Sequence, residues 1–449
     1  MAFCRDIRTL VGKSRMRTEN RHAGSHREPL CSHGSSSGAE HDHNIRPICA
    51  LGSADMMRDF TLVIPTYNRA QQLAALLGYL ETQNADCRVL VLDSSGPEVL
   101  AANRERVAAS SLDVEFAEFP DLEPIEKWRQ GIHKVTTPFC ALCADDDLVI
   151  LDGVRRCLVS LRSNLTASVV QGYSFTFLLR PDGDLELNNI VYFRPTIDDP
   201  SPLERLTKLF QQYQALNYGV FRARVLQRIL DALQPMKQTL ARELLWSALT
   251  AVSGHVIRLP HFSYGRSMGP SAAYDYWHPL EWLCKDPDSL FAEYLHYREL
   301  TAAAIIKRTD NEHQLDEICD MLDLIHLRYL ARHLPDSAVE FIAGQQISGT
   351  SFAEYWPRHE IHVPLYQAAG IRPSPGSEKL GPLNIRGPER SYHLFPNFYA
   401  PGEIDSPPMD SIVHLINALD GYRVVRQCSF EKDNSQTAER DGDERMGHG

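Results

Sequence analysis

A regular alternation of short apolar runs and helical patterns over residues 60–163 constrains the fold of this chain most. The runs FTLVIPT, CRVLVLD and PFCALCA are continuous and apolar, as in strands buried on both faces of a parallel sheet, and LDVEFAEF alternates. Between them, leucines recur at helical spacing from Leu73 to Leu80, and Pro124 suits the first turn of a helix. The alternation predicts an α/β protein with a doubly wound, mostly parallel sheet and helices on both faces.

Acidic residues stand where two of the predicted strands end. Asp93 closes the run CRVLVLD, and Asp145, Asp146 and Asp147 directly follow PFCALCA. Ligands of an open parallel sheet bind beyond the carboxyl ends of its strands, so these side chains are candidate site residues. Adjacent carboxylates repel one another unless they are hydrated or share a cation. A hard cation such as Mg²⁺ or Mn²⁺ would suit them and keep positions open for phosphate oxygens; a solvated acidic turn or a helix cap is the alternative.

Composition argues against several classes of protein. The net charge of -12 disfavours nucleic acid or an anionic lipid surface as a partner. No apolar stretch approaches the roughly 18 to 20 residues of a membrane span, and the N-terminus lacks the apolar segment of a secretion signal. Cys140 and Cys143 fall in a predicted strand, where positions three apart face opposite sides. We therefore expect a cytoplasmic protein whose cysteines form neither a disulfide framework nor a redox pair.

The chain divides by sequence character into four parts. Residues 1–57 are rich in Arg, His, Ser and Gly without periodicity, which predicts a disordered tail. The alternating pattern and the elements after it define a domain over 58–280. A mainly helical accessory region is expected over 281–429, and residues 430–449 predict a second disordered, charged tail.

Three motifs together resemble the family 2 glycosyltransferases of the GT-A fold. They are VIPTYNR at Val63–Arg69, VLVLDSS at Val89–Ser95 and CADDDLV at Cys143–Val149, and their order and spacing also match that family. The resemblance covers roughly residues 58–265. It implies a GT-A-type sheet, a nucleotide-diphospho-sugar donor, Mn²⁺ or Mg²⁺ as cofactor, and an acceptor (glycan, lipid-linked or protein) that the sequence does not identify.

The resemblance also implies roles for individual residues. Those expected to line the nucleotide-sugar pocket are Pro65, Thr66, Asn68 and Arg69 of the first motif, Asp93 at the base, and Asp145 and Asp146 at the ribose. Asp147 would ligate the metal on the diphosphate. Because the family often spaces these residues as D-x-D-D or as a D-D pair, the choice of ligand stays open, and Asp145 is a second candidate.

An inverting transferase also needs a base to deprotonate the acceptor hydroxyl, and the resemblance implies an acidic residue at the start of a later helix. Residues 239–260, TLARELLWSALTAVSGHVIRLP, predict a helix, a glycine and a strand. Glu243, in the first turn and away from the apolar stripe, is the candidate base; a solvated glutamate favoured by the helix dipole is the alternative. Arg266 could neutralise the leaving diphosphate.

We therefore predict a metal-dependent, inverting glycosyltransferase of hexosyltransferase type. The main alternative is a non-catalytic relative that binds a nucleotide-sugar or a glycan, and it would lack a base at the sugar. A third possibility is a sugar-phosphate nucleotidylyltransferase. Such enzymes normally carry a Gly-rich, basic first loop for a triphosphate, which PTYNRAQQ does not provide.

Overall fold

The computed structural model describes residues 57–179, 185–192, 194–268, 287–309, 315–333, 383–386, 391–394, 407–408 and 410–426. All of them belong to a single unit of the chain. The two tails expected at 1–57 and 430–449 lie outside the described residues, apart from Met57. The predicted division into domains is not tested by the structure and stays a prediction.

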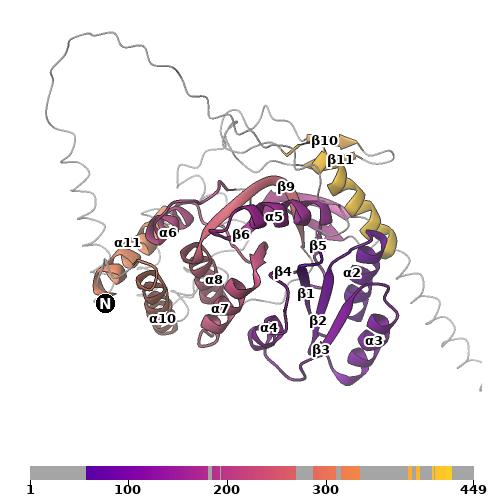
Figure 1. Cartoon of the computed structure of the whole chain (residues 1–449), viewed down its shortest axis with the longest axis horizontal. Helices are drawn as coiled ribbons and strands as arrows, with labels where there is room; N and C mark the ends of the chain where they lie inside the picture. The colour runs from indigo at the N-terminus through magenta and orange to yellow at the C-terminus, as the bar shows by residue number, and fades with distance from the viewer. Residues whose placement is uncertain are drawn as a thin grey trace, which may run out of the picture. The chain divides into compact units, whose positions relative to one another are not determined.

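One mixed sheet dominates the described part of the chain (Figure 1). Its strands are β1 Phe60–Thr66, β2 Arg88–Asp93, β3 Val114–Glu118, β4 Phe139–Leu142, β5 Leu148–Val149, β6 Ala167–Leu179, β7 Leu185–Val191, β8 Val220–Arg222 and β9 His255–Ser267. Their order is β3-β2-β1-β4-β8-β6-β9-β5, with β7 paired to β6. A separate hairpin pairs β10, Leu383–Arg386, with β11, Ser391–Leu394.

The first four strands run parallel in the order 3-2-1-4, because a helix carries the chain back after each of the first three. The predicted α/β class and the parallel sheet are confirmed in this half. The other half is mixed: β8 lies antiparallel to both β4 and β6, whereas β6 and β9 are parallel. Short β8 joins the two halves.

Helices cover both faces of the sheet, as predicted. They are α2 Ala70–Thr82, α3 Pro97–Ala108, α4 Pro124–Ile132, α5 Leu151–Ser163, α6 Pro202–Gln211, α7 Ala223–Leu233, α8 Thr239–Ser253, α10 Pro287–Ile306, α11 Leu315–His333 and a helix of residues 410–426. None of the described helices has the length and apolar character needed to cross a bilayer.

Two apolar cores lie on opposite faces of the sheet. Alternate residues of β1 divide between them: Leu62 and Ile64 join α2, α5 and the helix of residues 410–426 in the first core. Val63 joins α4, α6, α7 and α8 in the second, which also takes in α10 and α11. Cys143 packs in the first core and Cys140 in the second, and neither forms a disulfide, so the predicted packing role of this pair is confirmed.

Helix α4 packs closely against β2 at Gly131. A Cβ atom on Gly131 would come within 2.2 Å of Leu92 Cδ1, so only glycine permits this approach. The close contact brings the first turn of α4 beneath the carboxyl ends of β1 and β2.

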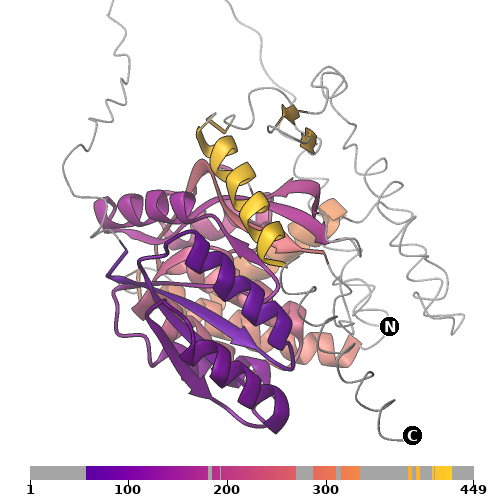
Figure 2. The same ribbon diagram turned by 90° about the vertical axis from the view of Figure 1, so that its right-hand side faces the viewer.

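The helix of residues 410–426 closes the first core from the far end of the sequence (Figure 2, yellow). Tyr422 packs edge-on against Tyr79 of α2, with ring centroids 5.8 Å apart, and against Phe177 of β6 at 6.1 Å. At the helix start, the Phe262 N–H donates to Ser411 Oγ at 2.9 Å. This helix falls within the accessory region expected over 281–429, but it packs on the sheet itself.

Candidate functional site

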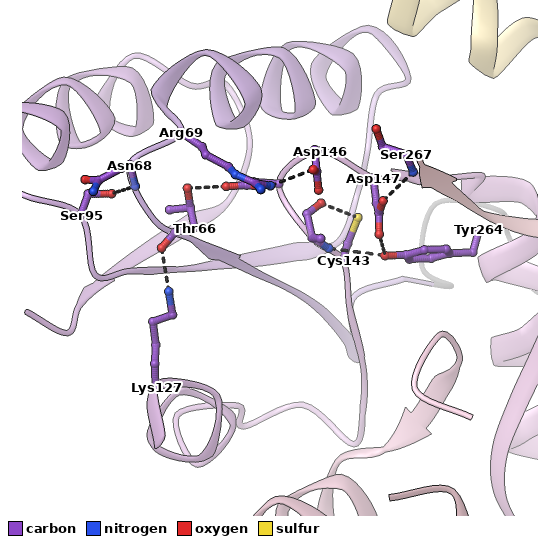
Figure 3. A network of polar contacts seen from close by, with 12 residues as sticks. Thr66, Asn68, Arg69, Ser95, Lys127, Cys143, Asp146, Asp147, Tyr264 and Ser267 are labelled. Atoms are coloured by element: carbon purple, nitrogen blue, oxygen red, sulfur yellow. Dashed lines mark hydrogen bonds and ion pairs between the residues drawn. The ribbon is translucent and has the colours of Figure 1, made fainter. Parts of the chain in front are cut away.

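The carboxyl ends of β1, β2 and β4 meet at one edge of the sheet, and the residues that follow them form a polar network (Figure 3). β1 ends at Thr66, β2 ends at Asp93, and the acidic triplet of residues 145–147 follows β4. Because β1 lies between β2 and β4, the loop after β1 separates the two acidic groups. The structure thus brings together the three motifs found in the sequence.

Asp145 and Asp146 share one arginine. Thr66 Oγ1 donates to Asp145 Oδ2 at 2.7 Å, and Arg69 Nη1 donates to Asp145 Oδ1 at 3.1 Å and to Asp146 Oδ2 at 2.7 Å. Burial raises the pKa of Asp145 to about 6, and the bonds from Thr66 and Arg69 oppose this rise. Arg69 therefore supplies, from within the chain, positive charge that these two carboxylates need.

The loop after β1 is locked to the loop after β2. Ser95 Oγ accepts from the Asn68 N–H at 2.8 Å, and the Gly96 N–H donates to Asn68 Oδ1 at 2.9 Å. Asn68 has a φ of 53°, a left-handed conformation that asparagine tolerates better than most residues. Asp93 is fully buried, and its two oxygens accept from the Ser95 N–H and Asn103 Nδ2, both at 2.7 Å. Asp93 thus fixes the loop after β2, and that loop in turn positions Asn68.

Lys127 of α4 is a buried cation beneath this pair of loops. Its Nζ donates to the Thr66 carbonyl oxygen at 2.7 Å and to Ser94 Oγ at 2.8 Å. Burial lowers its pKa to about 8, although Asp93 and Asp145 nearby favour the charged form. Lys127 is one of the residues that the sequence analysis missed, because a lysine in the first turns of a helix gives no sign of being buried.

Asp147, the last residue of the triplet, faces the opposite way from its neighbours. Its Oδ2 accepts from the Tyr264 hydroxyl at 2.5 Å, and its Oδ1 accepts from the Ser267 N–H at 2.8 Å. Both partners come from β9. Burial raises the pKa of Asp147 to about 7, and the Tyr264 and Ser267 bonds, with Arg266 close by, oppose the rise.

The donor set at the triplet fits a metal held by a single protein carboxylate. Within the described residues, no three acidic, histidine or cysteine groups converge as a ready-made cation site. Each oxygen of Asp145 and of Asp147 accepts one hydrogen bond and keeps a second lone pair, but Asp145 is already ion-paired with Arg69, whereas both hydrogen-bond donors to Asp147 are neutral. Mg²⁺ is commonly bound through one or two carboxylates with the rest of its ligands from water and phosphate, so Asp147 is the residue compatible with that role.

Glu243, the candidate base, lies half-buried on α8. It is the fifth residue of that helix, so it begins the second turn rather than lying in the first. Its Oε1 accepts from the Tyr213 hydroxyl at 3.0 Å. Burial raises its pKa, against the effects of the Tyr213 bond and of nearby Arg266. Glu243 is therefore held in place, and its proton affinity exceeds that of a solvated glutamate.

Aromatic rings and Arg266 connect Asp147 with Glu243. The rings of Tyr264 and Tyr218 are 4.8 Å apart, those of Tyr218 and Tyr192 are 5.5 Å apart, and Arg266 Cζ lies 5.9 Å from the Tyr218 ring centre. Glu243 and Arg266 both act on the pKa of Tyr192, which burial raises to about 12. These side chains extend the strand-end network toward α8.

Two other residues of the first motif differ in how they can meet a ligand. Pro65 lies within β1, in register with Leu92, so it shapes the strand end. Tyr67, which the sequence analysis did not single out, leaves 62% of its surface exposed beside Asn68. A large exposed aromatic next to a polar network suits stacking on a flat ligand.

Comparison with known proteins gives matches among solved structures alone: no protein-family model and no curated protein matches the chain. Residues 1–349 of S. aureus TarS in complex with UDP-GlcNAc match with 12% identity and a TM-score of 0.43, over 84% of this chain and 92% of that one. The mannosyltransferase PcManGT from Pyrobaculum calidifontis, in complex with GDP-Man and Mn²⁺, matches with 13% identity and a TM-score of 0.36, over 71% of this chain and 87% of that one. At these values the matches identify no family for the chain.

Proposed function

We propose that this chain is a glycosyltransferase that moves a sugar from a nucleotide-diphospho-sugar donor to an acceptor hydroxyl. One observation carries the proposal: the triplet of residues 145–147 joins two polar groups through a single turn. Asp145 faces the interlocked loops after β1 and β2, and Asp147 faces Tyr264 and the surroundings of Glu243. A donor needs two such adjoining sites, one for its nucleoside and one for its reacting sugar.

The nucleoside would bind at the loops that follow β1 and β2. Thr66, Asn68 and Arg69 are fixed there by hydrogen bonds, and Tyr67 offers an exposed ring for the base. Asp145 and Asp146 would meet the ribose, with Arg69 between them. Lys127, below, adds positive charge that favours the anionic donor.

The diphosphate would lie beside Asp147 and Arg266. Asp147 would hold Mn²⁺ or Mg²⁺, and when bound that cation would offset the charge that builds up on the departing nucleoside diphosphate. The guanidinium of Arg266 would offset the same negative charge on the departing diphosphate.

Glu243 would act as the base in an inverting displacement. Its carboxylate takes the proton of the acceptor hydroxyl, the hydroxyl oxygen bonds to the anomeric carbon, and the bond from that carbon to the diphosphate breaks. A raised pKa suits this task, because a more basic carboxylate accepts the proton more readily. Tyr213 would keep the carboxylate oriented.

The first test is a thermal-shift screen of the full chain against UDP, GDP, dTDP and CMP sugars, each with and without Mn²⁺. A donor that binds the folded state raises the melting temperature. No response to any nucleotide sugar would refute the proposal.

The second test separates transfer from binding. Glu243→Gln should bind the donor like the parent while transfer falls about 10² to 10⁴-fold, as expected for a lost general base. Glu204→Gln, an exposed glutamate near the start of α6, is the matched control and should transfer normally. Donor binding without transfer in the parent would instead support a non-catalytic binding protein.

A further inference from the structure

Arg258 of β9 is a half-buried cation whose partners are neutral. One Nη1 bond reaches Gln171 Oε1 on neighbouring β6, and its backbone N–H donates to Thr196 Oγ1 at 3.0 Å. Within the described residues, no carboxylate forms an ion pair with its guanidinium, and its Nε has no hydrogen-bond partner. Burial lowers its pKa to about 9. A desolvated charge without an opposite charge is unfavourable unless something else compensates it.

Arg205 shows how the same fold satisfies an arginine that serves packing. It is 5% exposed, and four backbone carbonyl oxygens accept from its guanidinium at 2.7 to 3.1 Å. Arg258 has one acceptor where Arg205 has four. The difference indicates that the environment of Arg258 is incomplete in the protein alone.

The side chain that bonds Arg258 also lacks an acceptor of its own. Gln171 Nε2 has no partner in the described part of the chain, and Gln171 is 1% exposed. With Arg258 Nε, it makes two groups able to donate. The ligand that completes such a set is an acceptor and, given the charge of Arg258, an anion.

This set adjoins the proposed sugar site. Tyr218 links the two, because a Cβ atom on neighbouring Gly219 would lie 2.6 Å from Gln171 Cγ, and the Tyr218 ring packs against Tyr192 and Tyr264. Arg258 therefore lies on the Glu243 side of the site, whereas the nucleoside loops lie beyond Asp147.

We propose that Arg258, with Gln171, binds a negatively charged group of the acceptor, either a phosphoryl or a carboxylate group. That the anion belongs to the acceptor rests on the proposed function, but the anion site itself does not. Arg258 would contact the anion, and Gln171 would hold the guanidinium in place.

Inorganic phosphate and acetate serve as probes, titrated into the full chain at constant ionic strength set with NaCl. We expect phosphate or acetate to raise the melting temperature, and Arg258→Gln to weaken the apparent affinity for that anion about tenfold or more. The better of the two probes identifies the source of the charge. Arg104→Gln, which removes an equal charge from an exposed side chain, should respond like the parent.

A second variant keeps the test decisive if Arg258→Gln does not fold. Gln171→Glu has nearly the same shape and gives Arg258 a carboxylate, so it should raise the melting temperature without added anion and abolish the anion response. Equal anion responses in the parent and in either folded variant would overturn the proposal. Failure of every nucleotide sugar to bind would overturn the proposed function. The anion titrations would still show whether Arg258 forms an anion site.

Discussion

The ammonium group of Lys127 lies 2.7 Å from the carbonyl oxygen of Thr66, so a cation carried by α4 fixes the end of β1. The same Nζ reaches Ser94 after β2, 2.8 Å away. One buried side chain thus sets the spacing of the two loops that we assign to the nucleoside.

Lys127→Met should weaken nucleotide binding and remove its pH dependence. The folded pKa of Lys127 is about 8, against 10.5 ordinarily, so the folded protein loses this charge as the pH rises through 8. Parent affinity for an anionic nucleotide should then fall between pH 7 and 9, while that of Lys127→Met stays flat. Because the unfolded chain keeps its proton up to about pH 10.5, parent stability should rise relative to the variant over pH 8 to 10.5.

Isothermal titration at several pH values measures the nucleotide affinity, with Lys134→Met as the control because Lys134 is exposed. A parent affinity independent of pH between 7 and 9 would remove Lys127 from the site.

Two substitutions of Asp93 separate a positioning role from direct contact with the base. Asp93→Ala leaves the Ser95 N–H and Asn103 Nδ2 without their acceptor, so it should weaken nucleotide binding even without metal and destabilise the fold by about 1 to 3 kcal/mol. Asp93→Asn can keep the Ser95 bond and donate to Asn103 Oδ1, which has no partner within the described residues. If Asp93 only positions the loop, Asp93→Asn binds nucleotide like the parent; a loss equal to that of the alanine variant indicates that the charge itself touches the ligand.

Asp147→Asn should preserve the fold and lose most of the metal-dependent gain in donor affinity. The amide oxygen can still accept from Ser267, and the amide nitrogen can donate to Tyr264, whose hydroxyl is able to accept. Since burial raises the pKa of Asp147 to about 7, the folded protein holds this proton between pH 4 and 7 while the unfolded chain does not. The parent therefore loses stability as the pH rises through this window, and the variant does not.

Urea unfolding at pH 5 and pH 8 should show the Asn variant gaining on the parent at the higher pH, by on the order of 1 kcal/mol or more. Asp113→Asn, on an exposed side chain, is the control. Metal-dependent donor binding that survives in Asp147→Asn would exclude Asp147 as the ligand.

Ending the chain before residue 410 should destabilise it strongly. The helix of residues 410–426 buries Ile412, Leu415, Leu419 and Tyr422 in the first core, and each such side chain contributes about 1.5 to 3 kcal/mol at most. A chain ending at residue 426 should melt like the full chain. Melting curves of the two truncated forms test this, and equal melting temperatures would show that the helix adds nothing to the core.

The parallel half of the sheet and its strand ends were predictable because they depend on local patterns. Continuous apolar runs that end in polar residues place Thr66, Asp93 and the triplet at one edge without any knowledge of distant contacts. β8 was not predictable in the same way, since three residues carry too little pattern to reveal that the sheet becomes mixed.

The contacts within the site depend on packing that no local pattern encodes. Lys127 is buried because Gly131 lets α4 approach Leu92, and that relation joins two separate motifs. Tyr264 reaches Asp147 across 117 positions of sequence. Asp145 and Asp147 point in opposite directions because Thr66 of β1 bonds the first and two residues of β9 bond the second. The run of three aspartates alone does not predict which of them faces which strand.

The contact between Tyr422 and Tyr79 also bears on how the chain is made. During synthesis, α2 and β6 leave the ribosome well before the residues that complete their side of the first core, since more than 200 residues separate Phe177 from Tyr422. Their apolar surfaces stay uncovered over that interval, when a nascent chain is most prone to associate with others. A slow stretch of translation while residues 180–409 are made, or a chaperone that covers α2 and β6 during that interval, would therefore influence the yield of this protein.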